Sequence, residues 1–276
     1  MLHPAEAGVT TVSGSSRTGG SSRIAAGARR DADIRRTAAD ARRALAGLAR
    51  PAGDFDASRY FRGTARLGFY NVGTARVRAL AREIVAAHQG WSAADALAFA
   101  DLLIANRYLE VKGLAIEVLA RFRRQFRPAF LRTWKRWLAA NAADNWATTD
   151  GICGMLIGPL LVAHPELVPR LAPWARDRNL WVRRAAIVAL IPPLRRHDVL
   201  DQVYATARML HTDDADLIQK AVGWALREAG KADPARLERY LRANGSRLPR
   251  TTVRYAIERF APPKRRALLE ETRANG

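Results

Sequence analysis

The stretch IQKAVGWALRE (residues 218–228) has the periodicity of a single amphipathic helix. One side of this helix is an apolar stripe, formed by Ile218, Ala221, Val222, Ala225 and Ala229. The opposite side carries Lys220, Gly223, Trp224 and Arg227. A tryptophan at that position either packs against another helix in a larger stack or offers its ring to a flat, anionic partner.

Helical periodicity continues along the chain, and no stretch shows the alternation expected of a strand. One long helical stretch begins at Ser92, which forms a capping box with Asp95. Another begins at Asp233, with Pro234 at its first helical position, and ends at residues 244–245, Asn-Gly. The sequence therefore predicts an all-α chain.

Several of these helices resemble one another. Three stretches can be aligned: NWATTDGICGML (145–156), LWVRRAAIVALI (180–191) and IQKAVGWALREA (218–229). Trp146, Arg184 and Trp224 occupy equivalent positions in them, and their spacing of about 40 residues is the length of one HEAT-type helix pair. Equivalent positions of successive repeats face the same way, so we predict a HEAT-like repeat α-solenoid with a concave basic groove, which these three residues line.

The composition is strongly basic. The 276 residues include 46 Lys and Arg against 26 Asp and Glu, a formal charge of +20. This excess indicates a polyanionic partner, or else reflects a generally Arg-rich proteome. The sequence contains one cysteine, Cys153, so an internal disulfide is excluded. The five histidines are scattered, without the spacing typical of metal ligands, and we therefore expect no metal site and no cofactor. The apolar run GMLIGPLLVA is short for a membrane span, and we expect a soluble, cytoplasmic, monomeric protein.

The N-terminal region differs in composition from the rest. Residues 1–30 are rich in Gly, Ser and Arg without apolar periodicity, which predicts a disordered leader, and residues 31–276 are expected to form one domain. The leader lacks the apolar segment of a secretory signal. It is either a transit peptide or a loose cationic arm.

The first repeated stretch also contains an acid. Asp150 lies one helical turn after Trp146 and on the same side, next to small residues such as Ala147 and Gly151 that leave room for a pocket. The alternative is a helix-capping aspartate beside a core tryptophan. Arg184 shares its side of the helix with apolar residues, so it requires a counter-anion, either a carboxylate of the same chain or a phosphate.

A second basic feature is the stretch RFRRQFRPAFLRTWKRW (residues 121–137), with seven cations and no acid. Its aromatic residues recur every four positions: Phe122, Phe126, Phe130 and Trp134. This spacing predicts that the aromatic rings lie in the core. We expect the cations to face the phosphates of a polyanionic partner rather than solvent alone.

The chain resembles the HEAT-like DNA alkylation repair glycosylases of the AlkD type over roughly residues 31–273. The segments that carry the resemblance are SRYFRG, YNVGTARVRALAREI, NWATTD, LWVRRAAI and LIQKAVGWALRE. The resemblance implies that Trp146 and Trp224 form aromatic walls of a lesion site and that Asp150 is the catalytic carboxylate. It implies DNA contacts by Arg184, Arg227, Lys220 and Tyr60. Relatives often have a second acid after the first Trp, where this chain has Ala147, and we expect this difference to alter local polarity.

The implied activity is hydrolysis of the N-glycosidic bond of cationic N3- or N7-alkylpurines in double-stranded DNA. Alkylation makes the base a good leaving group, and a carboxylate stabilises the positive charge that develops on the sugar. Indole faces attract cations, and neither a metal nor another cofactor is needed. Such an enzyme would be nucleoid-associated.

Two other functions are compatible with the residues. The first is a HEAT-repeat DNA-binding module that recognises damaged or distorted DNA without cleaving it. The second is a protein-interaction scaffold, whose positive charge reflects only a generally Arg-rich proteome. The Trp146–Asp150 pair favours the glycosylase over both.

Overall fold

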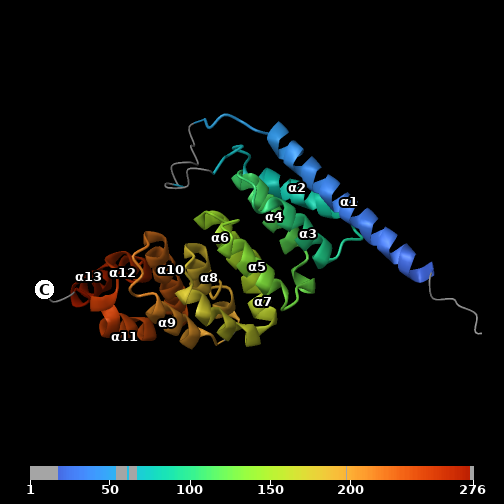
Figure 1. Ribbon diagram of the computed structural model, residues 1–276. Helices are drawn as coiled ribbons and strands as arrows, with labels where there is room; N and C mark the ends of the chain where they lie inside the picture. The colour runs from blue at the N-terminus through green and yellow to red at the C-terminus, as the bar shows by residue number, and fades with distance from the viewer. Residues whose placement is uncertain (1–17, 54–60, 62–66, 197, 274–276) are drawn as a thin grey trace, which may run out of the picture.

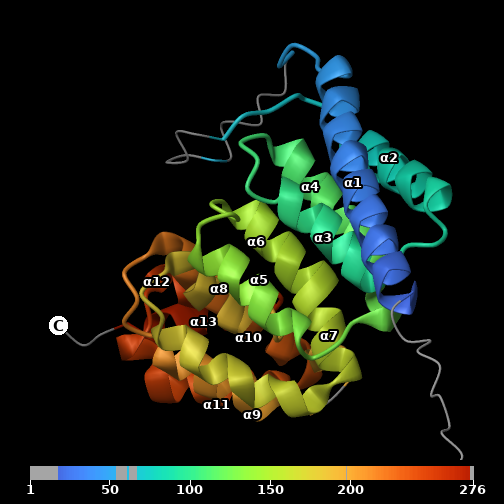
Figure 2. The same ribbon diagram turned by 45° about the vertical axis from the view of Figure 1, so that its right-hand side comes forward.

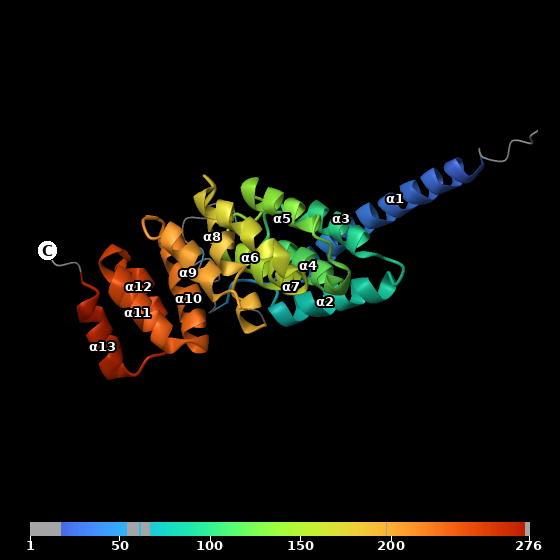
Figure 3. The ribbon, with the colours of Figure 1, turned by 90° about the horizontal axis from the view of Figure 1, so that it is seen from below.

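The computed structural model describes residues 18–53, 61, 67–196 and 198–273. The prediction of an all-α chain is confirmed, since the described residues form helices and no strand. Among them, one isolated parallel bridge joins Gly68 to Tyr108. The helices follow one another from α1 at one end to α13 at the other, as expected for an α-solenoid (Figures 1 and 3).

The α-helices are α1 (Thr18–Gly47), α2 (Thr74–Ala87), α3 (Ala93–Leu103), α4 (Leu109–Ala120), α5 (Phe130–Ala139), α6 (Trp146–Ile152), α7 (Gly158–Ala163), α8 (Leu180–Val188), α9 (Leu200–Met209), α10 (Asp216–Ala232), α11 (Pro234–Asn244), α12 (Arg250–Ala256) and α13 (Pro262–Glu271). A π-helical turn, η3 (Cys153–Ile157), joins α6 to α7. The 3-10 elements are η2 (Arg123–Gln125), η4 (Pro165–Arg176), η5 (Pro193–Arg195) and η6 (Gly245–Arg247).

The even-numbered helices form a continuous row, in which α2, α4, α6, α8, α10 and α12 each pack against the next. Other elements pack against this first row, among them α3 against α4, α5 and η4 against α8, and α9 and α11 against α10. At the N-terminal end, α1 packs across α2, α3 and α4 (Figure 2). The first row is the one that carries Trp146, Arg184 and Trp224, because these residues belong to α6, α8 and α10.

The predicted helix starts at Ser92 and Asp233 are confirmed. Ser92 and Asp95 form the capping box of α3, and the Asp233 side chain accepts a hydrogen bond from the Arg236 backbone at the start of α11. Helical structure begins at Thr18, however, before the boundary near residue 31 that the composition predicted. The Ala and Arg content of residues 24–43 favours a helix more than the Gly and Ser content opposes it. The rest of the predicted leader, residues 1–17, lies outside the described residues.

The aromatic side chains of residues 121–137 lie in or against the core, as predicted. Trp134 is fully buried, Phe122 and Phe126 are buried, and Phe130 packs against them. The rings of Phe126 and Trp134 meet edge-on with centroids 5.1 Å apart. These contacts hold η2 and α5 in place and leave the cations of the stretch on the outside.

The apolar run treated above as too short for a membrane span belongs to a longer helix. Residues 146–163 form one helical run of 18 residues that is long and apolar enough to cross a membrane by length and composition alone. Half of the run is buried by the surrounding helices, and it contains Asp150. These features are typical of a core helix in a solenoid.

Candidate active site

A cleft of about 1020 Å³ opens between helices α6, α8, α10 and α12 of the first row. Its lining includes two tryptophans predicted as site residues, Trp146 and Trp224, together with Asp150 and Arg184. Further lining residues are Phe61, Leu180, Trp181, Ala215, Asp216, Leu217, Lys220, Arg227 and Tyr255. The three aligned stretches therefore do bring their equivalent positions to one surface, as the repeat spacing predicted.

The local sequence of α6 positions Trp146 and Asp150. Asn145 caps the helix, and its side chain accepts a hydrogen bond of 2.8 Å from the Thr148 backbone. Asp150 is therefore not the capping residue, and that alternative is excluded. It lies one turn after Trp146, and both side chains face the cleft. The π-helical turn η3 follows directly, a deviation that is frequent at functional sites.

Asp150 and Arg184 form a bidentate ion pair. The Arg184 Nε and Nη2 atoms lie 2.8 and 2.7 Å from the two carboxylate oxygens, and Nη1 donates to the Leu217 carbonyl. The Asp150 and Arg184 side chains are only 17% and 6% exposed. Burial raises the pKa of the Asp150 carboxyl above its ordinary value, while the Arg184 guanidinium opposes that shift. Of the two counter-anions expected for Arg184, the structure shows the carboxylate of the same chain.

An aromatic residue that the sequence analysis did not single out completes this part of the cleft. The Phe61 ring is stacked on the Trp146 indole, with centroids 5.2 Å apart and planes 9° from parallel. Trp224 is partly buried and lies on the same cleft. Phe61 is part of the SRYFRG motif, so its aromatic character was the only signal in the sequence. Its neighbour Tyr60, a predicted DNA contact, lies outside the described residues.

The cleft is mixed in charge rather than basic. Lys220 lies 2.7 Å from Asp216, and Arg227 pairs with Glu258 on α12. Arg184 is paired as described above. Each of the three predicted phosphate contacts within the described residues thus already has a carboxylate partner, and the lining does not show the predicted concave basic groove.

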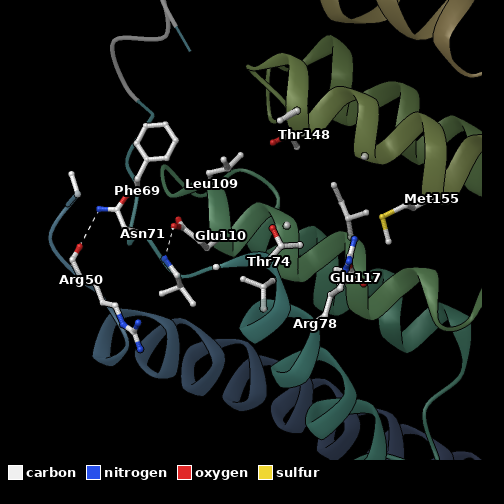
Figure 4. Close-up of a pocket in the computed structure, with 18 of the residues that line it drawn as sticks. Arg50, Phe69, Asn71, Thr74, Arg78, Leu109, Glu110, Glu117, Thr148 and Met155 are labelled. Carbon is white, nitrogen blue, oxygen red and sulfur yellow. Dashed lines mark hydrogen bonds and ion pairs between the residues drawn. The ribbon is translucent and has the colours of Figure 1, made fainter. Parts of the chain in front are cut away.

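A second, mainly apolar pocket of about 520 Å³ lies on the other side of α6 (Figure 4). Ala147 and Gly151 of α6 and Met155 of η3 line it, with residues of α2 and α4 opposite. The small residues Ala147 and Gly151 therefore do leave room for a pocket, but this pocket lies beside the cleft and is not part of it. Ala147 lines this pocket and not the cleft, so the change in local polarity expected at this position would fall in the second pocket.

The carboxylates at the second pocket are occupied by structural contacts. Glu110 accepts hydrogen bonds from the backbone amides of Tyr70 and Val72, and Glu117 pairs with Arg78 at 2.9 Å. No group of three or more His, Cys, Asp or Glu side chains that could hold a metal ion is found in the described parts of the chain.

The family model for DNA alkylation repair enzymes matches residues 41–260. The chain belongs to this family. The matched region contains every predicted site residue, so the resemblance seen in the sequence motifs is confirmed.

Solved structures extend the comparison. The chain is similar to a predicted DNA alkylation repair enzyme from Enterococcus faecalis, with a TM-score of 0.64 and 18% sequence identity. The match covers 71% of this chain and 90% of the other. At this identity the likeness supports the fold alone. No curated protein matches the chain. Membership of the family makes this chain an enzyme of DNA repair with DNA as its partner.

Proposed function

We propose that this DNA alkylation repair enzyme is a glycosylase that hydrolyses the N-glycosidic bond of cationic N3- or N7-alkylpurines in duplex DNA. The observation that carries the proposal is a buried carboxylate, Asp150, held at a fixed orientation by Arg184 on a cleft lined with aromatic rings. Such a group is suited to stabilise positive charge that develops next to it.

Asp150 and the two tryptophans of the cleft have different proposed roles in the reaction. As the bond from the sugar to the base nitrogen breaks, its electron pair neutralises the cationic base, and positive charge builds on the sugar. Asp150 stabilises that charge and orients the water molecule that attacks the sugar. Trp146 and Trp224 stabilise the cationic base or sugar by cation–π interaction, worth about 0.5–2 kcal/mol each.

The pairing of Arg184 with Asp150 supports a different proposed role from the phosphate contact implied by the resemblance. A bidentate guanidinium fixes both oxygens of Asp150 and so sets the direction in which the carboxylate acts. Lys220, Arg227 and Tyr60 remain as proposed contacts to the DNA backbone. The enzyme is proposed to act as a monomer near the nucleoid.

The proposal is tested by release of free base from methylated duplex DNA. Asp150→Asn is expected to lower the single-turnover rate about 10²-fold or more, while the DNA affinity is retained. Asp216→Asn is the matched control, since Asp216 lines the same cleft but is 62% exposed and pairs with Lys220. Absence of base release by the wild-type protein, with intact DNA binding, would favour a non-catalytic DNA-binding module.

A further inference from the structure

A group of arginines outside the cleft lining has no carboxylate partner among the described residues. The stretch of residues 121–136 carries seven cations, and three of them are engaged: Arg121 with the Arg78 carbonyl, Lys135 with Asp177 and Arg136 with Asp101. The other four are exposed and form no ion pair within the described parts of the chain: Arg123, Arg124, Arg127 and Arg132. These four residues are called the η2 patch below.

The η2 patch is held rigidly. Phe122 and Phe126 flank η2 and are buried, and the Gln125 side chain accepts a 3.0 Å hydrogen bond from the backbone amide of Ala93 at the start of α3. Asp95, in the first turn of α3, is already paired with Arg30 of α1. The patch is therefore a fixed array of cations, with its neighbouring acid neutralised.

The position of the patch separates it from the cleft. None of the four arginines lines the cleft, and η2 follows the end of α4, a helix that contributes no residue to the cleft lining. Likewise, Arg127 precedes α5, a helix of 10 residues, whereas Trp146 follows it. A helix of 10 residues spans about 15 Å. The patch thus lies around the start of α5, the end of that helix away from Trp146.

The contrast in charge indicates what the patch binds. The cations of the cleft are paired with carboxylates, so much of the attraction for a polyanion must come from elsewhere on this +20 chain. Several unpaired arginines in a rigid array suit the repeated phosphates of a nucleic-acid backbone. Resting on the proposed function, which supplies duplex DNA as the partner, we infer that the η2 patch binds a second segment of duplex DNA, separate from the segment that carries the lesion.

The experiment measures whether one protein holds two duplexes. An undamaged biotinylated duplex is immobilised, and capture of a second, fluorescent duplex is followed as protein is added. Asp150→Asn protein is expected to bridge the duplexes as well as wild type, since the patch is independent of catalysis. The quadruple variant R123A/R124A/R127A/R132A is expected to lose bridging. It should also reduce the salt-dependence slope of total DNA binding by about 3.6 units, since each of the four phosphate contacts contributes about 0.9.

Two controls separate the patch from general charge and from misfolding. The quadruple Arg→Lys variant at the same positions keeps the charges and should still bridge. Replacing four other exposed arginines without a described ion pair, Arg35, Arg42, Arg82 and Arg239, removes the same charge and should leave bridging intact. Wild-type protein that does not bridge, or a patch variant that bridges normally, would overturn the inference. Base release is measured separately, so failure of the proposed glycosylase activity is distinguishable from failure of the patch.

Discussion

Replacing Arg184 with methionine removes the counter-charge of the buried Asp150 carboxylate. Breaking a buried ion pair in this way costs about 3–5 kcal/mol. Because Asp150 keeps 17% of its side-chain exposure, we expect a loss near the lower end, about 3 kcal/mol in the free energy of unfolding. The Leu217 carbonyl also loses its donor.

The converse substitution leaves the opposite charge unpaired. The raised pKa of Asp150 means that the fold disfavours the ionised carboxylate relative to the unfolded chain, even with Arg184 present. Asp150→Asn supplies a neutral side chain of the same shape, but it leaves the buried Arg184 guanidinium without its counter-charge, and we expect it to cost about 3 kcal/mol as well. The double variant Asp150→Asn/Arg184→Met should recover most of the stability that Arg184→Met loses.

The assay is urea unfolding of the wild type and the three variants at neutral and acidic pH. Without Arg184, the pKa of Asp150 rises further in the folded state. A raised carboxyl pKa adds stability at low pH that is lost as the pH rises through that pKa, so the deficit of Arg184→Met should shrink on acidification. A deficit that is absent at neutral pH, or that grows as the pH falls, would refute this account of the pair.

Three further substitutions test the surroundings of the cleft. Gly223→Ala should destabilise the chain by about 1–3 kcal/mol, because its Cβ would lie 2.4 Å from the Tyr255 Cβ; thermal unfolding measures this, and an unchanged melting temperature would contradict it. Phe61→Ala removes the ring that is stacked on the Trp146 indole, and it should lower the single-turnover rate of base release about 2- to 10-fold. An unchanged rate would show that Phe61 does not contribute to the site. Ala147→Asp should leave that rate unchanged, since position 147 faces the second pocket; a large loss would place it in the cleft.

Much of the fold followed from the sequence, because helical periodicity and capping residues are local signals. The capping box at Ser92 and the start of α11 at Asp233 lie where they were predicted. The meeting of Trp146 and Trp224 on one cleft also followed, since repeat spacing converts sequence distance into position along a solenoid.

The contacts within the site depended on tertiary structure. Arg184 needed an anion, but nothing local could show that Asp150, 34 residues away, would supply it rather than a phosphate. The stacking of Phe61 on Trp146 connects a segment that precedes α2 in the chain to α6. The helical periodicity of the sequence does not predict a contact of this kind. The helix start at Thr18 was missed because the Gly and Ser content of the leader outweighed its Ala and Arg content in the interpretation.

The central claim is that Asp150 and the aromatic cleft act on a base that already carries positive charge. It is tested most directly by single-turnover base release from matched duplexes that contain 7-methylguanine, 3-methyladenine or uracil, with chelator present throughout. The account predicts release of the two cationic bases, lowered about 10²-fold or more in Asp150→Asn, and no release of uracil. Efficient release of uracil, or near-wild-type release of 7-methylguanine by Asp150→Asn, would contradict it.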